Sequence, residues 1–335
     1  MCPISNWIEI IEMRQVKMTL CATILMIALF SVAAASQKAI QVNVTLVTVP
    51  VMVMDKAGKC IRDLKASDFR VFENGKEQKI DRLVPDSEPF NVALLIDSSG
   101  STHFRSGEMQ QAALAFVDAL RPGDRLMVAS FDGRISYNSG FTDDHPVLRA
   151  AIAQEHQGIL TWLYDAVDSV MKERLDRISG RKAMVLFTDG VDNESQRVDA
   201  VGSLANIERS DVIVYAIQYD TRKDGLSDRF AVPPPPGYAT FGELYARAVR
   251  YLRDLTSHSG GRLFRAETMG SLQEAFSQVA QELSLQYTLC YYPADQKHGG
   301  SYRRLRVTVD RPNVIVRART GYRPNSPSDH PGWPR

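Results

Sequence analysis

The 335-residue chain lacks several patterns that would point to a particular chemistry. It has no CxxC pair, so neither a zinc site of that kind nor thioredoxin-type redox chemistry has support. It also has no GxxxxGK[ST] loop, GxSxG turn or HExxH pair, and therefore no motif of a P-loop NTPase, an esterase or a zinc protease. Neither sign of charge is in excess: the net charge of +1 provides no broad basic field, so we expect no nucleic-acid partner.

Long apolar runs are also scarce, and the longest stands near the N-terminus. Residues 19–33 are almost wholly apolar, follow two basic residues and end at small residues, which is typical of a secretory signal peptide. A membrane anchor is the alternative, but a bilayer span needs about 20 apolar residues and this run is shorter. We expect residues 1–35 to be a signal peptide and the mature protein to be secreted or periplasmic, without a membrane span. Residues 1–12 do not fit the pattern, so translation starting at Met13 or Met18 is a further hypothesis.

Cysteine is rare, with four residues in the chain. Signal cleavage would remove Cys2 and Cys21 and leave Cys60 and Cys290 in an oxidising compartment, where a disulfide can persist. Two unpaired buried thiols are the alternative. The sequence favours neither.

The middle of the chain alternates strand-like and helix-like patterns. The aliphatic run Val92–Ile96 suits a strand buried on both faces, and the apolar stripe in residues 107–121 has the helical period. Strands that alternate with helices predict an α/β fold, a Rossmann-like, doubly wound and mostly parallel sheet. The further strand candidates are Leu126–Phe131, Ile135–Phe141 at an edge, Ala183–Thr188, Val212–Gln218 and Arg262–Arg265. The further helix candidates are Leu163–Leu175, Ala200–Arg209, Phe241–His258 and Ser271–Leu285.

Both flanks of this α/β region have strand patterns. On the N-terminal side, Asn74-Gly75 between strand-like segments predicts a type I′ hairpin. Each flank has about 40 residues, too few for a core of its own, so we expect the two to pair as one small β-sandwich with the α/β domain inserted. The expected parts are 1–35 (signal peptide), 36–88 and 285–323 (the two halves of the sandwich), 89–284 (the inserted domain) and 324–335 (a disordered tail).

The C-terminal strands are rich in arginine. We interpret these residues as one face of a sheet in contact with solvent, and a patch for an acidic partner or a surface polymer is the alternative. The arginines are Arg303, Arg304, Arg306, Arg311, Arg317 and Arg319.

Carboxylates and hydroxyls follow two strands of the predicted sheet. Asp97, Ser99 and Ser101 follow Val92–Ile96, and Asp189 follows another strand. In an open parallel sheet such strand ends gather ligands where the crossover direction switches. Two carboxylates at this rim would repel each other unless a cation neutralised them, and oxygen donors suit Mg²⁺, Mn²⁺ or Ca²⁺.

These residues resemble the metal-ion-dependent adhesion site of the von Willebrand factor A family. Asp97-Ser98-Ser99-Gly100-Ser101 is similar to its DxSxS motif, Thr161 in GILTWLYDAV to its threonine, and Asp189 in FTDGVDN to its second aspartate. The resemblance implies that Ser99 and Ser101 bind the ion directly, that Thr161 does so when ligand is present, and that Asp97 and Asp189 act mainly through water. Leu160 departs from the pattern, which usually has glycine there, and Trp162 stands where a small residue is common.

Residues 40–323 also resemble secreted bacterial von Willebrand A-related proteins of the kind abundant in Acidobacteria. The implied function is binding without catalysis: a divalent cation, Mg²⁺ by preference, accepts a carboxylate of a partner protein. The alternative is a structural module of an envelope assembly in which the metal site is unused and the β-sandwich makes the contacts.

Overall fold

The computed structural model describes residues 46–84, 88–100, 106–154, 158, 160–219, 240–295 and 300–324. All of them belong to one compact unit, Thr45–Arg335. The predicted signal peptide, Ser101 and all but Pro324 of the predicted tail lie outside the described residues. Within the described part, no helix has the length and apolarity needed to cross a bilayer.

A six-stranded sheet forms the centre of the α/β region. Its strands are β5 (Phe90–Asp97), β6 (Arg125–Phe131), β7 (Ile135–Tyr137), β8 (Arg181–Thr188), β9 (Ile213–Tyr219) and β10 (Leu263–Ala266). They lie in the order β10-β9-β8-β5-β6-β7, and every pair is parallel except β6 with the edge strand β7. The chain runs from β5 to β6 on one side and later returns to β8 on the other, so the crossover direction switches at β5.

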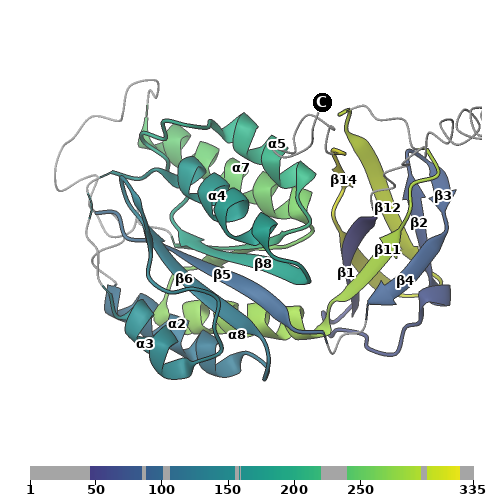
Figure 1. Cartoon of the computed structure of the whole chain (residues 1–335), viewed down its shortest axis with the longest axis horizontal. Helices are drawn as coiled ribbons and strands as arrows, with labels where there is room; N and C mark the ends of the chain where they lie inside the picture. The colour runs from purple at the N-terminus through teal and green to yellow at the C-terminus, as the bar shows by residue number, and fades with distance from the viewer. Residues whose placement is uncertain are drawn as a thin grey trace, which may run out of the picture. The chain divides into compact units, whose positions relative to one another are not determined.

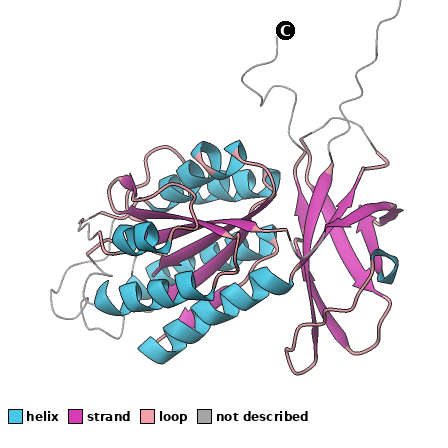
Figure 2. Cartoon of the chain, turned by 60° about the horizontal axis from the view of Figure 1, so that its bottom comes forward, coloured by secondary structure: helices cyan, strands magenta, loops and turns pink. Residues whose placement is uncertain are grey.

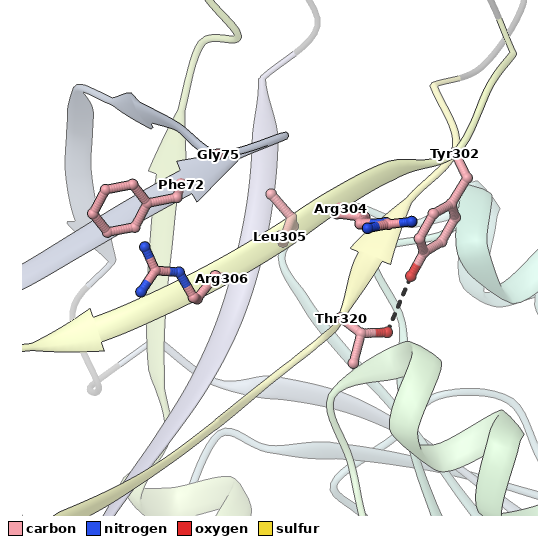
Figure 3. Close-up of a pocket in the computed structure, with 7 residues that line it drawn as sticks. All are labelled: Phe72, Gly75, Tyr302, Arg304, Leu305, Arg306 and Thr320. Carbon is pink, nitrogen blue, oxygen red and sulfur yellow. Dashed lines mark hydrogen bonds between the residues drawn. The ribbon is translucent and has the colours of Figure 1, made fainter.

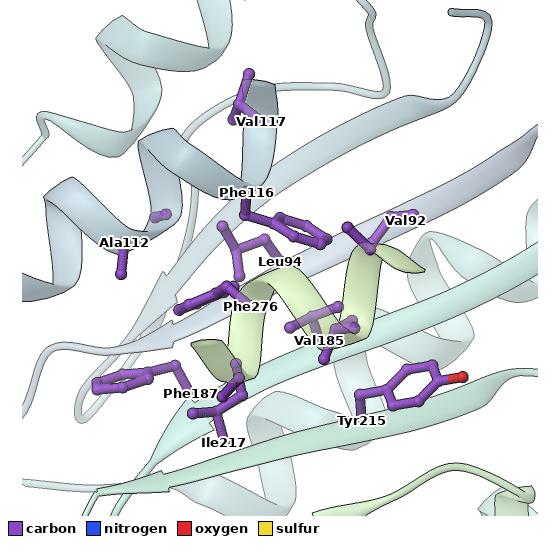
Figure 4. Close-up of a cluster of buried hydrophobic side chains, with 14 of the residues drawn as sticks. Val92, Leu94, Ala112, Phe116, Val117, Val185, Phe187, Tyr215, Ile217 and Phe276 are labelled. Carbon is purple, nitrogen blue, oxygen red and sulfur yellow. The ribbon is translucent and has the colours of Figure 1, made fainter. Parts of the chain in front are cut away.

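Helices cover both faces of this sheet (Figures 1 and 2). They are α2 (Ser106–Ala119), α3 (His145–Ile152), α4 (Leu163–Glu173), α5 (Ala200–Arg209), α7 (Phe241–Ser259) and α8 (Met269–Leu285). Val92 and Leu94 point into the core under α2, α3 and α8, where Phe116 and Phe276 lie 5.5 Å apart between ring centroids (Figure 4). Ala93 and Leu95 point into the core under α4, α5 and α7. Burial on both faces explains why β5 is aliphatic rather than alternating.

The flanks form two antiparallel four-stranded sheets. Their strands are β1 (Val47–Asp55), β2 (Phe69–Glu73), β3 (Lys76–Gln78), β4 (Ile80–Val84), β11 (Tyr287–Tyr291), β12 (Arg303–Val309), β13 (Val314–Ala318) and β14 (Gly321–Tyr322). The orders are β13-β1-β11-β4 and β14-β12-β2-β3, so each sheet combines strands from both ends of the chain. A shared core that includes Val49, Val71, Leu289 and Leu305 lies between them. The expected pairing of the two flanks is confirmed, as is the expected α/β fold.

The Asn74-Gly75 turn has the predicted geometry. Both residues have positive φ, 49° and 82°, as a type I′ turn requires, and the turn joins β2 to β3. The short helix α3 was not among the predicted helices. Its sequence signal was local: Asp144 caps it by accepting a hydrogen bond from the amide of Val147 at 3.1 Å, and a proline stands in its first turn.

The prediction of one solvated arginine face was wrong for three of the six arginines. Arg303 and Arg319 are buried, and Arg317 pairs with the buried Glu282 of α8. Arg319 donates hydrogen bonds to the carbonyl oxygens of Glu208 and Ser210, at 2.8 and 2.9 Å. These three side chains tie strands to neighbouring elements, whereas Arg304, Arg306 and Arg311 are exposed.

Cys60 and Cys290, the cysteines within the described part of the chain, are unpaired thiols. Cys290 lies opposite Thr48 on β1 and Cys60 opposite Met54, six positions further along the same strand. A strand rises about 3.3 Å per residue, so the two sites are about 20 Å apart. A disulfide needs Cα atoms roughly 4.4–6.8 Å apart. Of the two alternatives left open by the sequence, the structure has the unpaired thiols.

Candidate metal-binding site

The candidate site lies at the carboxyl end of the central sheet, where the crossover direction switches. Asp97 is the last residue of β5, and Asp189 directly follows the neighbouring strand β8. Both carboxylates are buried, with exposed fractions of 0% and 1%. Ser99 and Thr161 are buried as well. The strand-end rule therefore places both predicted aspartates at one rim.

Asp97 is held by hydrogen bonds from two strand ends. Its Oδ1 accepts from the amide of Ser99 at 3.0 Å, and its Oδ2 accepts from the hydroxyl of Thr188, the last residue of β8, at 2.6 Å. Thr188 Oγ1 in turn accepts from the amide of Gly190 at 3.0 Å. Thr188 thus fixes the Asp97 carboxylate relative to the turn that carries Asp189.

The segment that carries Thr161 is joined to the loop after β5. Ser99 forms a parallel bridge with Gly158, and the amide of Gly158 donates to the carbonyl of Ser98 at 3.3 Å. Position 158 requires glycine, because a Cβ there would lie 2.3 Å from the Cβ of Asp132. The missing side chain therefore lets this segment pack against the turn after β6, which carries Asp132.

The same segment is also joined to the loop after β8. The amide of Thr161 donates to Oδ1 of Asn193 at 2.8 Å, and the amide of Asn193 donates to the carbonyl of Thr161 at 3.1 Å. One turn later, the buried Asp165 accepts from the amides of Gln196 and Val198 at 2.8 and 3.0 Å. The structure thus brings the predicted residues Asp97, Ser99, Thr161 and Asp189 onto three mutually bonded loops.

The two departures from the family pattern have defined places. Leu160 packs over Gly133, where a Cβ would lie 3.3 Å from the Cβ of Leu160. A glycine in the turn after β6 thus makes room for the leucine that replaces a glycine in the threonine loop. Trp162 is partly buried, its amide donates to the carbonyl of Asp132 at 2.9 Å, and its indole nitrogen is buried without a hydrogen-bond partner.

The electrostatics of the site favour a cation. The pKa of Asp97 is raised to about 7, because burial and then the negative charge of Asp189 raise it by more than the hydrogen bonds from Ser99 and Thr188 lower it. Two buried carboxylates that repel each other fit a divalent ion, and the hydroxyls of Ser99 and Thr161 are the oxygen donors that Mg²⁺ accepts. Among the described residues, no three His, Cys, Asp or Glu side chains group as a metal site, so a site here depends on hydroxyl ligands as well.

Sequence reasoning missed Thr188 and Asn193, both of which position predicted site residues. Thr188 ends a mostly apolar run and was predicted only as the last residue of a strand. That its hydroxyl holds Asp97 follows only from the pairing of β8 with β5. For Asn193 a signal was present, since the polar run Asp192–Ser195 begins only three positions after the predicted aspartate Asp189.

Residues 91–278, more than half of the chain, match the family model of the von Willebrand factor type A domain. None of the curated proteins compared with the chain matches it.

Similar solved structures include the vWF domain of the type V pili tip protein Mfa5 from Porphyromonas gingivalis, with 13% identity, coverage of 58% of this chain and 95% of that one, and a TM-score of 0.46. A von Willebrand factor type A protein from Catenulispora acidiphila has 12% identity, coverage of 78% and 75%, and a TM-score of 0.47. Proximal thread matrix protein 1 from the mussel byssus, with a zinc-occupied MIDAS motif, has 16% identity, coverage of 63% and 49%, and a TM-score of 0.45. The family match over residues 91–278 shows that this chain belongs to the von Willebrand factor type A domain family.

Proposed function

We propose that the chain is a non-enzymatic binding protein that recognises a carboxylate of a partner protein through a divalent cation, Mg²⁺ by preference. Domains of this family typically act as protein-interaction modules and commonly bind a divalent metal. The residues proposed to hold the ion are Asp97, Ser99, Ser101, Thr161 and Asp189. When bound, the ion supplies a coordination position that a partner carboxylate can fill.

One observation carries this proposal: two buried carboxylates share the switch point of the sheet. The pKa of Asp97 is raised because its charge is buried close to that of Asp189. Such an arrangement destabilises the protein unless a cation is present, so the simplest role for it is to bind one. Thr188 and Asn193 hold Asp97 and Thr161 in place through the hydrogen bonds described above, which reduces the reorganisation that ion binding requires.

Titration calorimetry with Mn²⁺ tests the metal site. We expect Asp97→Asn, which keeps the size of the side chain, to lower the Mn²⁺ affinity by about 10- to 100-fold, the range found when residues that support a metal ligand are removed. The matched control is Asp118→Asn, because Asp118 is an exposed carboxylate on α2 that pairs with Arg149. Equal affinities in Asp97→Asn and in the unsubstituted protein would refute the metal site. They would leave the alternative of a structural module whose contacts are made by the β-sandwich.

We also propose that the domain acts outside the cytoplasm, which rests on the signal-peptide pattern in residues 1–35. N-terminal sequencing of the mature protein is expected to start near Ser36 or Gln37. An intact N-terminus on the mature protein would contradict this proposal.

A further inference from the structure

A groove of about 380 Å³ lies on the β-sandwich, away from the candidate metal site. It runs along β12 between Phe72 of β2 and Thr320, next to β14 (Figure 3). Phe72 and Arg306 lie at one end of the groove, Tyr302 and Thr320 lie at the other, and Arg304 lies between them. None of these residues belongs to the candidate metal site.

The walls of the groove are held in place. The guanidinium of Arg306 lies 4.3 Å from the ring centroid of Phe72, and the hydroxyls of Tyr302 and Thr320 are 3.0 Å apart. The ring of Tyr302 lies directly on Gly321, where a Cβ would meet it at 2.4 Å. Stacking fixes the plane of a guanidinium and leaves its N–H edges available for a ligand.

The groove carries unneutralised positive charge. Arg304 and Arg306 are exposed, and within the described part of the chain neither has an ion-pair partner. The neighbouring Arg303, by contrast, is buried and bonded to Glu73 at 2.8 Å. The acidic residue that the strand register places beside the groove is Glu77 of β3, opposite Phe72 on the side away from β12. The chain as a whole has a net charge of only +1, so this cationic pair is a local feature.

The spacing of the two arginines indicates the form of the ligand. Arg304 and Arg306 are alternate residues of one strand, so their side chains leave the same face about 6.6 Å apart. Alternate side chains of an extended peptide have the same spacing, and a guanidinium pairs with a carboxylate through two parallel hydrogen bonds. A sugar polymer would need a free aromatic face for stacking, but Arg306 lies over the ring of Phe72 and the ring of Tyr302 lies against Gly321. We propose that this groove binds an extended acidic peptide segment of a partner protein, whose carboxylates on alternate residues pair with Arg304 and Arg306.

The proposal is tested with the full-length protein in EDTA, so that the candidate metal site does not contribute. The probe is a fluorescein-labelled peptide of four Glu-Thr repeats, and its binding is followed by fluorescence anisotropy. The comparison peptides are four Gln-Thr repeats, which have no charge, and Glu-Glu-Glu-Glu-Thr-Thr-Thr-Thr, which has the same charge in a different spacing. We expect the Glu-Thr peptide to bind most tightly and the Gln-Thr peptide not to bind.

Substitutions locate the binding. Arg304→Gln with Arg306→Gln is expected to weaken the binding of the Glu-Thr peptide by about tenfold or more, since two charge-assisted contacts are lost. The double substitution Arg209→Gln with Arg311→Gln, at exposed arginines outside the groove, should leave binding unchanged. Arg304→Lys with Arg306→Lys keeps the charge but not the paired hydrogen bonds, and should also bind more weakly.

Three results would overturn the proposal. They are equal binding by the Gln variant and the unsubstituted protein, full retention of binding in the Lys variant, and dextran sulfate of equal charge binding more tightly than the peptide. The last result would assign the groove to an anionic polysaccharide. Mn²⁺ calorimetry in the Arg304→Gln/Arg306→Gln variant should give the unsubstituted affinity, which keeps failure of this proposal separate from failure of the metal site.

Discussion

Asp97 combines complete burial with a carboxyl group that faces a second negative charge. A carboxyl group whose pKa is higher in the folded protein than in the unfolded chain destabilises the fold once the unfolded chain loses its proton. For Asp97 the loss of stability begins above about pH 4, where an aspartate in the unfolded chain ionises. It reaches its full size above about pH 7, where Asp97 is ionised in the folded protein as well.

The pH dependence of stability follows from this shift. In EDTA, we expect Asp97→Asn to gain stability relative to the unsubstituted protein between pH 4 and pH 8, by on the order of 4 kcal/mol. Urea unfolding of both proteins at several pH values measures the difference. A constant difference across this range would mean that Asp97 is ionised in the fold at all these pH values.

Asn193 provides a second residue-scale prediction, which rests on the proposed metal site. Its side chain accepts from the amide of Thr161 at 2.8 Å, so Asn193→Ala should leave the threonine loop less well fixed. We expect about a 3- to 10-fold loss of Mn²⁺ affinity by calorimetry and a stability loss of about 1 kcal/mol. The control is Asn206→Ala, whose amide bonds Asp168 at 2.6 Å away from the site; it should lose stability but not Mn²⁺ affinity.

Among the helices, α7 shows how one terminal residue depends on its surroundings. It ends at Gly260, which has a φ of +87° and donates from its amide to the carbonyls of Thr256 and Ser257. A Cβ at this position would lie 2.9 Å from the backbone nitrogen of Arg319. Helix termination and the close passage of the chain after β13 therefore both require glycine at position 260.

Gly260→Ala is therefore expected to destabilise the protein by about 2 kcal/mol, from the left-handed conformation and the close contact together. Gly242→Ala, in the first turn of the same helix, adds a Cβ that would make only an ordinary contact, 3.6 Å from Oγ1 of Thr240, and should be neutral or stabilising by up to about 1 kcal/mol. Urea unfolding compares the two. If both substitutions have the same effect, the conformation of Gly260 is not the cause.

Most elements could be predicted from the sequence because their patterns are local. The helix Ala200–Arg209 was predicted with its observed bounds, and Val92–Ile96 lies within the slightly longer β5. The helix α3 was missed because it has only 8 residues, too few for a helical period to stand out. Contacts between residues that are distant in the sequence could not be predicted from local patterns. The buried pair of Arg303 and Glu73, for example, joins positions 230 residues apart.

At the scale of the whole molecule, Glu73 joins the two ends of the chain inside the β-sandwich. It is buried and accepts hydrogen bonds from the hydroxyls of Tyr291 and Tyr322, at 2.6 and 2.8 Å. It also pairs with Arg303 at 2.8 Å. The carboxylate of an N-terminal strand is thus bonded to three polar groups of the C-terminal flank.

Glu73→Ala should cost about 3–5 kcal/mol, because it removes the carboxylate that neutralises the buried Arg303. Glu77→Ala, at an exposed position on the next strand, is the control and should change the free energy of unfolding by less than about 0.5 kcal/mol. Urea unfolding measures both. A loss below about 1 kcal/mol for Glu73→Ala would show that water replaces the carboxylate.

Part of the candidate site could be predicted because, like the strands and helices, it follows from local sequence patterns. Asp97 and Asp189 end adjacent parallel strands, so the rule for strand ends brings them together without knowledge of the loops. The supporting contacts of Thr188 and Asn193 depend on how three loops meet, and no pattern within any one loop encodes that. Cys60 and Cys290 illustrate the limit: both lie within the flanks that the sequence predicted to pair, but their separation along β1 follows only from the strand register.

β4 and β11 are hydrogen-bonded neighbours, and Val84 lies opposite Thr288. In connectivity the pair is a hairpin in which everything from β5 to α8 takes the position of the turn. Such an architecture needs just one point of entry and exit in its host, so a whole binding domain could be gained, lost or exchanged in evolution without altering the pairing of the strands that carry it.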